Sequence, residues 1–204
     1  MFRVVIIFIF CILKSVAQDS LAIRDILSFQ DNLNKEFASK DTSPLLHEDL
    51  EEFRTLSFYT IDTSYRIRAK FLRTPYESTF VMKTTSGSEP VYVKYGELSF
   101  VLEDVNYVLN IYQNQVLVTN PEYADYLFLP FTDLTNGDTT YAGGRFIDLK
   151  IPEGNTILID FNKAYNPYCA YNTRYSCPIP PEENHLATKI RAGVKRFKQY
   201  PENK

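Results

Sequence analysis

Histidine is scarce in this chain of 204 residues, which contains only His47 and His185. The two histidines lie far apart in sequence, and there is neither an H-E-x-x-H motif nor a cysteine-rich zinc pattern. A G-x-S-x-G nucleophile elbow and a phosphate-binding P-loop are also missing. We therefore expect no bound metal and no cofactor.

Tryptophan is absent and glycine occurs only seven times, whereas there are fifteen tyrosines and fifteen phenylalanines. So little glycine argues against a flexible or fibrous chain, and the many aromatic residues favour a sheet-rich core. The formal net charge is −3, so the chain lacks the basic character of a nucleic-acid-binding protein. The length suits one domain with a sizeable core.

A long apolar run is found only at the N-terminus. Arg3 precedes the apolar residues 4–13, and Ser15-Val16-Ala17 offers a small-x-small cleavage site. Ten apolar residues are too few to span a bilayer. We expect a signal peptide over residues 1–17, a single β-rich domain over residues 18–204 with no transmembrane segment, and a periplasmic or extracellular location after cleavage near Ala17. Cleavage also removes Cys11, which leaves an even pair of cysteines for an oxidising compartment.

The rest of the chain predicts one or two helices followed by strands. Apolar side chains at helical spacing predict helices over residues 19–40 and 45–54. From Leu56 onward the period is two, and a hairpin turn is expected near Glu103-Asp104. About seven short strands without helices between them indicate an antiparallel β-barrel or sandwich. The expected strands are residues 66–71, 79–84, 91–103, 106–113, 126–131, 146–151 and 156–161, and we expect the last two to pair with each other.

The segment of residues 160–184 is rich in cysteine, asparagine, tyrosine and proline. Pro178, Pro180 and Pro181 exclude helix and sheet interior, and a long polar loop is either functional or disordered. Because disordered segments are poor in aromatic residues, we expect a loop that is ordered by its own side chains.

Cys169 and Cys177 in this loop are spaced C-x7-C, unlike the C-x2-C pairs of zinc ribbons and thioredoxin-like redox sites. We favour a structural disulfide in an oxidising compartment. Two unpaired thiols, or a pair with metal or redox chemistry, are the alternatives.

The motifs YAGGRFIDL and FNKAYNPYCAYNTRYSCPIPPEEN resemble the signature of a bacterial and archaeal family of domains of unknown function, number sixteen eighty-four in that series. SFYTIDTSYRIRAKF, MKTTSG and LPFTDLTNGDTTYAGGRF are softer matches in the expected order, so the resemblance covers about residues 25–198. It implies no activity, because the family has none assigned. Some relatives lack export signals and keep a similar cysteine pair, which leaves the thiols open as functional groups.

Polar side chains gather just before residues 146–151 and just after residues 156–161. The planar guanidinium of arginine can bind a carboxylate or a phosphate. The asparagine amide orients polar ligands, and tyrosine provides a flat ring surface and one hydroxyl. This mixture suits a small polar or anionic ligand at a barrel mouth. The candidate ligand-binding residues are Tyr141, Arg145, Asn162, Tyr165, Asn166, Tyr171 and Asn172.

Three functions fit this pattern. The first is an exported binding module for the polar or anionic ligand. The second is a hydrolase-like enzyme in which Asp148 or Asp160 acts as acid or base and Arg145 steadies negative charge; a minor version uses Cys169 as nucleophile and His185 as base. The third is a structural interaction module of the cell envelope. A purely structural alternative pairs Arg145 with Asp148 or Asp160 to hold the loop, and the basic tail after residue 184 is interpreted as a solvated face.

Overall fold

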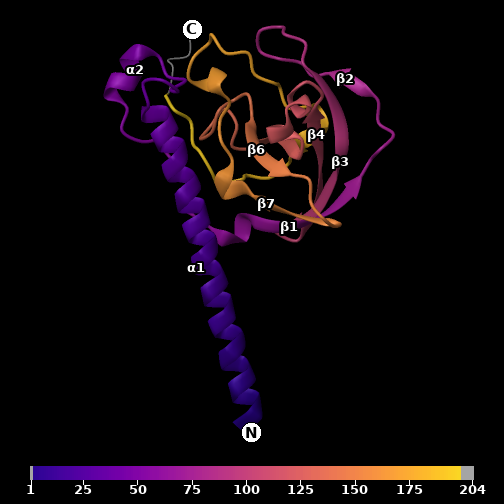
Figure 1. Ribbon diagram of the computed structural model, residues 1–204. Coiled ribbons are helices and arrows are strands. Elements are labelled where there is room, and N and C mark those ends of the chain that lie inside the picture. The colour runs from indigo at the N-terminus through magenta and orange to yellow at the C-terminus, as the bar shows by residue number, and fades with distance from the viewer. Residues whose placement is uncertain (1, 199–204) are drawn as a thin grey trace.

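The computed structural model describes residues 2–198 and consists of a long N-terminal helix and a curled antiparallel sheet (Figure 1). Helix α1 spans Phe2–Ala38 and the short helix α2 spans His47–Glu52, so both predicted helices are present. The strands are β1 (Arg66–Arg73), β2 (Thr79–Val81), β3 (Val91–Leu102), β4 (Val105–Asn114), β5 (Tyr126–Asp133), β6 (Arg145–Lys150), β7 (Thr156–Asp160) and β8 (His185–Leu186).

The main path of the sheet runs β6-β5-β4-β3-β1-β7, with β2 paired to β3 and β8 paired to β5. All of these pairs are antiparallel except β5 with β8. The sheet curls into a half-barrel, which confirms the predicted mainly β fold. Strand β8 was not expected from the sequence, since two residues are too few to show a period.

The predicted pairing of the last two long strands is wrong. Strand β6 pairs with β5, and β7 pairs with β1. Strands β6 and β7 therefore lie at opposite ends of the sheet path. The curl brings the two edges near each other. The outer edge of β6 is instead paired by the loop after β7, where Phe146 and Tyr165 exchange backbone hydrogen bonds of 2.9 and 3.0 Å.

Strand β5 separates two groups of buried side chains. Leu127, Leu129 and Phe131 enter the main core of the half-barrel, while Phe128 packs on the other face against Phe146. The continuous apolar run in this strand is therefore buried on both sides, as predicted. Each fully buried leucine or phenylalanine contributes roughly 1.5–3 kcal/mol to stability. Aromatic residues of the second face, Phe128 and Phe146 among them, line a cavity.

The turn between β3 and β4 is the predicted hairpin at Glu103-Asp104. Both residues have positive φ, at 50° and 61°, and Leu102 pairs directly with Val105. This backbone matches the right-handed twist of the flanking strands, although asparagine and glycine adopt it more easily.

Helix α1 packs on the domain through its second half. Ala22, Ile26 and Phe37 are buried there, and Figure 1 shows the N-terminal half of the helix extending away from the sheet. Among residues 2–198, no helix combines the length and apolar character needed to cross a membrane.

Candidate functional site

The loop after β7 is ordered by short-range polar contacts. Asp160 caps the 3-10 turn Phe161–Lys163 by accepting a hydrogen bond from the Asn162 backbone N–H at 3.0 Å. The Asn162 side chain then accepts from the Asp62 N–H at 3.0 Å and donates to the Asp62 carbonyl at 2.9 Å. Asp160 also forms an ion pair with Arg66, with 3.3 Å between the charged atoms. The predicted candidates Asp160 and Asn162 are thus buried anchors of the loop.

Asn166 joins the same loop to the C-terminal segment. Its side-chain amide donates to the Lys195 carbonyl at 2.9 Å and to the Tyr171 hydroxyl at 3.3 Å, and both Asn166 and Tyr171 are buried. Since the loop carries many prolines and few regular backbone pairs, these side-chain bonds fix its position.

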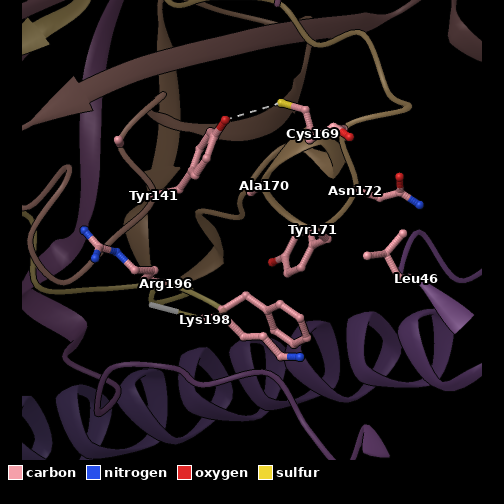
Figure 2. A pocket seen from close by; sticks show the side chains of 11 residues that line it. Leu46, Tyr141, Cys169, Ala170, Tyr171, Asn172, Arg196 and Lys198 are labelled. Carbon is pink, nitrogen blue, oxygen red and sulfur yellow. Dashed lines mark hydrogen bonds between the residues drawn. The ribbon is translucent and has the colours of Figure 1, made fainter. Parts of the chain in front are cut away.

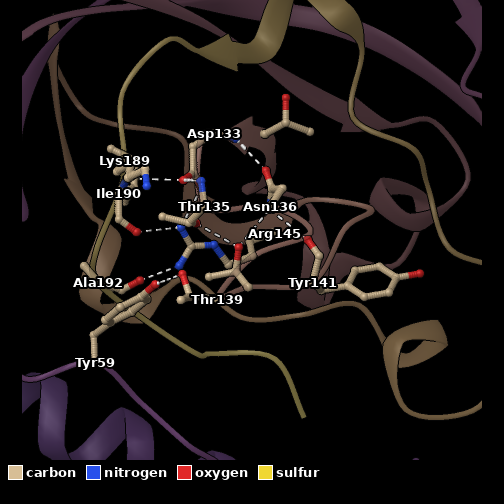
Figure 3. A network of polar contacts seen from close by, with 12 residues as sticks. Tyr59, Asp133, Thr135, Asn136, Thr139, Tyr141, Arg145, Lys189, Ile190 and Ala192 are labelled. Carbon is tan, nitrogen blue, oxygen red and sulfur yellow. Dashed lines mark hydrogen bonds and ion pairs between the residues drawn. The ribbon is translucent and has the colours of Figure 1, made fainter. Parts of the chain in front are cut away.

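Arg145 is fully buried and bonded to protein groups (Figure 3). Its guanidinium donates to Asp133 at 2.7 Å, to the Ile190 carbonyl at 2.9 Å and to the Ala192 carbonyl. Burial lowers the pKa of Arg145, and the ion pair with Asp133 opposes that shift. Neither Asp148 nor Asp160 is its partner, so the structural alternative in the sequence analysis named the wrong carboxylates. Arg145 holds the segment of residues 190–192 against β5 and β6.

The predicted acid–base set is not assembled around Arg145. Arg145 and Asp148 are three positions apart on β6, so their side chains lie on opposite faces of the sheet. Asp160 is bonded to Asn162 and Arg66 instead.

Several cavities border the loop, and the first we call the basic cavity (Figure 2). Its volume is about 510 Å³. Three predicted ligand-binding residues, Tyr141, Tyr171 and Asn172, line it together with the cations Arg196 and Lys198. The other lining residues are Leu46, Ala142, Cys169, Ala170, Thr173 and Phe197. The basic tail is therefore not simply a solvated face, because two of its cations border this cavity.

Both cations of the basic cavity have protein partners. Arg196 donates to the Gly137 carbonyl, and Lys198 forms an ion pair with the buried Asp49. These contacts hold the two side chains beside the cavity. Sequence periodicity could not indicate that Arg196 and Lys198 border a cavity, because residues 191–198 form no helix or strand.

The two cysteines line different cavities, Cys169 the basic cavity and Cys177 a second one. Both are thiols in this structure, and the Cys169 N–H donates to the Cys177 sulfur at 3.2 Å. The Tyr141 hydroxyl lies 3.7 Å from the Cys169 sulfur. The hydrogen bond from the Cys177 thiol lowers the pKa of Cys169, and the same contact raises the pKa of Cys177.

His185 is not placed as a base for Cys169. The His185 ring nitrogen Nδ1 lies 3.0 Å from the Thr132 hydroxyl on β5. Within residues 19–198, whose side chains the structure describes, the side-chain partner of the Cys169 thiol is the Tyr141 hydroxyl, at 3.7 Å. The predicted cysteine–histidine arrangement is absent from these residues.

The second cavity, which we call the aromatic cavity, has a volume of about 420 Å³. The predicted residues Asp148 and Tyr165 line it, and Asp148 accepts hydrogen bonds of 2.7 Å from the hydroxyls of Tyr126 and Tyr165. Burial raises the pKa of Asp148, and these two bonds oppose the shift. The other lining residues are Phe29, Leu33, Glu36, Tyr92, Leu117, Phe128, Phe146, Pro167, Tyr168, Tyr175, Ser176, Cys177 and Pro178.

Comparison with known proteins adds a family and a structural relative. A family model described as "Protein of unknown function (DUF1684)" matches residues 51–195, which include all eight strands and both cysteines. The chain is also similar to an uncharacterized protein of Haloarcula marismortui, whose solution NMR structure has a TM-score of 0.69 and 29% sequence identity. That match covers 88% of this chain and 96% of the other. No curated protein matches the chain.

Proposed function

The chain belongs to the DUF1684 family of proteins of unknown function, and from this premise we propose that it is an exported protein that binds a small anionic ligand in the basic cavity. The observation that carries the proposal is the meeting of Tyr141, Tyr171 and Asn172 with Arg196 and Lys198 around one cavity. Its volume of about 510 Å³ lies within the usual range for small-molecule sites.

The charges around this cavity favour an anion. Two cations line it, and the carboxylate that approaches them, Asp49, is paired with Lys198. The guanidinium of Arg196 has five N–H donors and uses one of its nitrogens for the Gly137 carbonyl. It keeps donors for a carboxylate or phosphate, which a planar guanidinium recognises through two parallel hydrogen bonds.

A thermal-shift screen tests the proposal. The panel is phosphate, citrate, a nucleotide and neutral sugars, because a ligand that binds only the folded chain raises its melting temperature. We expect at least one anion to raise the melting temperature and the neutral sugars to have no effect.

Arg196→Gln provides the test variant, and Lys70→Gln on the exposed side of β1 removes the same charge far from the cavity. We expect Arg196→Gln to weaken anion binding by about tenfold, which is roughly 1.4 kcal/mol. Lys70→Gln should bind as the natural chain does. If no anion shifts the melting temperature, or if both variants bind equally well, the proposal fails.

Export is the second part of the proposal. The charged, apolar and small-residue regions of residues 1–17 support it. We expect the mature protein recovered from outside the cytoplasm to start at Gln18. Mass spectrometry of the intact secreted chain measures this directly, and an intact chain that stays in the cytoplasm contradicts it.

A further inference from the structure

We propose that the aromatic cavity is a second binding site, separate from the basic cavity, and that it takes an organic cation such as a quaternary ammonium group. The walls, the charges and the hydrogen bonds of the cavity each bear on this assignment.

Aromatic rings from three parts of the chain surround the cavity. The sheet supplies Tyr92, Tyr126, Phe128 and Phe146, α1 supplies Phe29, and the loop supplies Tyr165, Tyr168 and Tyr175. Several neighbouring rings stand nearly perpendicular to each other. The rings of Phe128 and Phe146 are 4.7 Å apart at 74°, and those of Phe146 and Tyr165 are 6.0 Å apart at 89°.

Eight aromatic rings line this cavity. The face of an aromatic ring carries partial negative charge and attracts cations, which is how aromatic cages hold methylated ammonium groups. A purely apolar ligand is stabilised by burial against the same rings, but it lacks the electrostatic attraction between a cation and the ring faces.

The charged groups of the cavity are both acidic. Asp148 faces Tyr126 and Tyr165, and Glu36 on α1 accepts a hydrogen bond from the Tyr168 hydroxyl. No lysine, arginine or histidine is among the described residues that line the cavity. Ion pairs within the described part of the chain include neither of these carboxylates, so a bound cation supplies their missing partner.

The two tyrosine hydroxyls orient the Asp148 carboxylate. Both donate to the same oxygen, Oδ1, at 2.7 Å, and the other oxygen, Oδ2, carries no bond from either tyrosine. Oδ2 thus remains available for electrostatic attraction to a quaternary ammonium group, which has no N–H to donate. An anion in the same place is repelled by Asp148 and Glu36, so the two cavities select opposite charges.

The affinity for the cation depends on pH with a defined sign. Desolvation at the cavity raises the pKa of Asp148, and the hydrogen bonds from Tyr126 and Tyr165 oppose that shift. A bound cation favours the carboxylate, and its affinity therefore rises with pH until Asp148 is fully ionised. The phenols that face Asp148, those of Tyr92, Tyr126, Tyr165 and Tyr168, have pKa values raised by burial and stay neutral over this range, as does the Cys177 thiol. Glu36 and Tyr175 are the remaining titratable groups at the cavity.

Calorimetric titration of the full chain with choline and with 3,3-dimethylbutan-1-ol tests the assignment. The two molecules have the same shape, and only choline is charged. We expect choline to bind at least about tenfold more tightly than the alcohol, and its affinity to rise with pH as Asp148 ionises. Equal affinity for the two molecules, or binding of neither, overturns the proposal.

Two variants locate the site. Asp148→Asn removes the charge and keeps the shape, and we expect it to reduce choline affinity by at least about tenfold. Asp104→Asn, in the exposed hairpin turn, changes the net charge equally and should leave choline binding unchanged. Unchanged choline binding in Asp148→Asn overturns the assignment of the site. If Asp148→Asn does not fold, Tyr165→Phe replaces it and should also weaken choline binding, since it removes the hydroxyl that orients the carboxylate.

Discussion

Replacing Arg145 by methionine separates a structural role from a ligand-binding role at this residue. The side chain is fully buried and donates to Asp133, Ile190 and Ala192. In the variant, Asp133 remains buried and keeps only backbone donors, those of Thr135 at 2.8 Å and Ile190 at 3.2 Å. Breaking a buried ion pair by removing one partner costs about 3–5 kcal/mol.

A loss of this size is a large part of the free energy of unfolding, which is typically about 5–15 kcal/mol. For a chain of this length the melting temperature changes by about 2–4 °C per kcal/mol, so we expect a decrease of roughly 6–20 °C. Lysine at position 145 should not restore stability, because a single ammonium group does not reproduce the planar fork that reaches three acceptors.

Urea unfolding of Arg145→Met measures the effect, with Arg68→Met on the exposed side of β1 as the control for the lost charge. The control should change stability by less than about 0.5 kcal/mol. The double variant Asp133→Asn/Arg145→Met should lose less than the sum of the two single losses, since it leaves no unpaired buried charge. If Arg145→Met loses less than about 1 kcal/mol and instead stops binding anions, the structural role is refuted.

Three further predictions concern the cysteines and the hairpin. Since the hydrogen bond from Cys177 lowers the pKa of Cys169, alkylation of Cys169 should reach its plateau rate at a lower pH than for an ordinary cysteine. Cys177→Ala, which removes the donor, should move that profile to higher pH; mass mapping at a series of pH values checks this, and identical profiles contradict it. In oxidising conditions the two neighbouring thiols should form a disulfide that raises the free energy of unfolding by roughly 2–3 kcal/mol. Thiol titration of the native protein after air oxidation checks this, and two reactive thiols would exclude the bridge. Replacing Glu103-Asp104 by Asn-Gly should raise the free energy of unfolding by about 0.5–1 kcal/mol, because both positions have positive φ; a lower melting temperature would show that the native side chains make stabilising contacts.

The strands could be predicted from local pattern because each signal lies within a few residues. Alternation in residues 66–71 predicted β1, and the unbroken apolar run after Tyr126 predicted a strand buried on both faces. Side chains also alternate between the two faces along β6, so Arg145 and Asp148 face opposite sides of the sheet. The candidate site in the sequence analysis placed these two residues together and overlooked this point.

The partners of these elements could not be predicted, because periodicity fixes the face of a side chain and not its neighbour. Nothing local indicates that β7 pairs with β1 rather than β6, or that Asp133 is the partner of Arg145. Arg196 borders the basic cavity only because backbone bonds place the irregular tail there, such as Lys195 N–H to Ser57 at 2.7 Å. Family resemblance supplied the extent of the domain but no chemistry for it.

The cysteine pair described above makes the two cavities physically adjacent. Cys169 borders one of them, Cys177 borders the other, and the sulfur of Cys177 touches the backbone of Cys169. Because folded interiors are close-packed, the two cysteine side chains have little room to move. A ligand that pushes one sulfur outward on its own side changes the space available on the opposite side, and occupancy of either chamber is thereby mechanically linked to the width of the other.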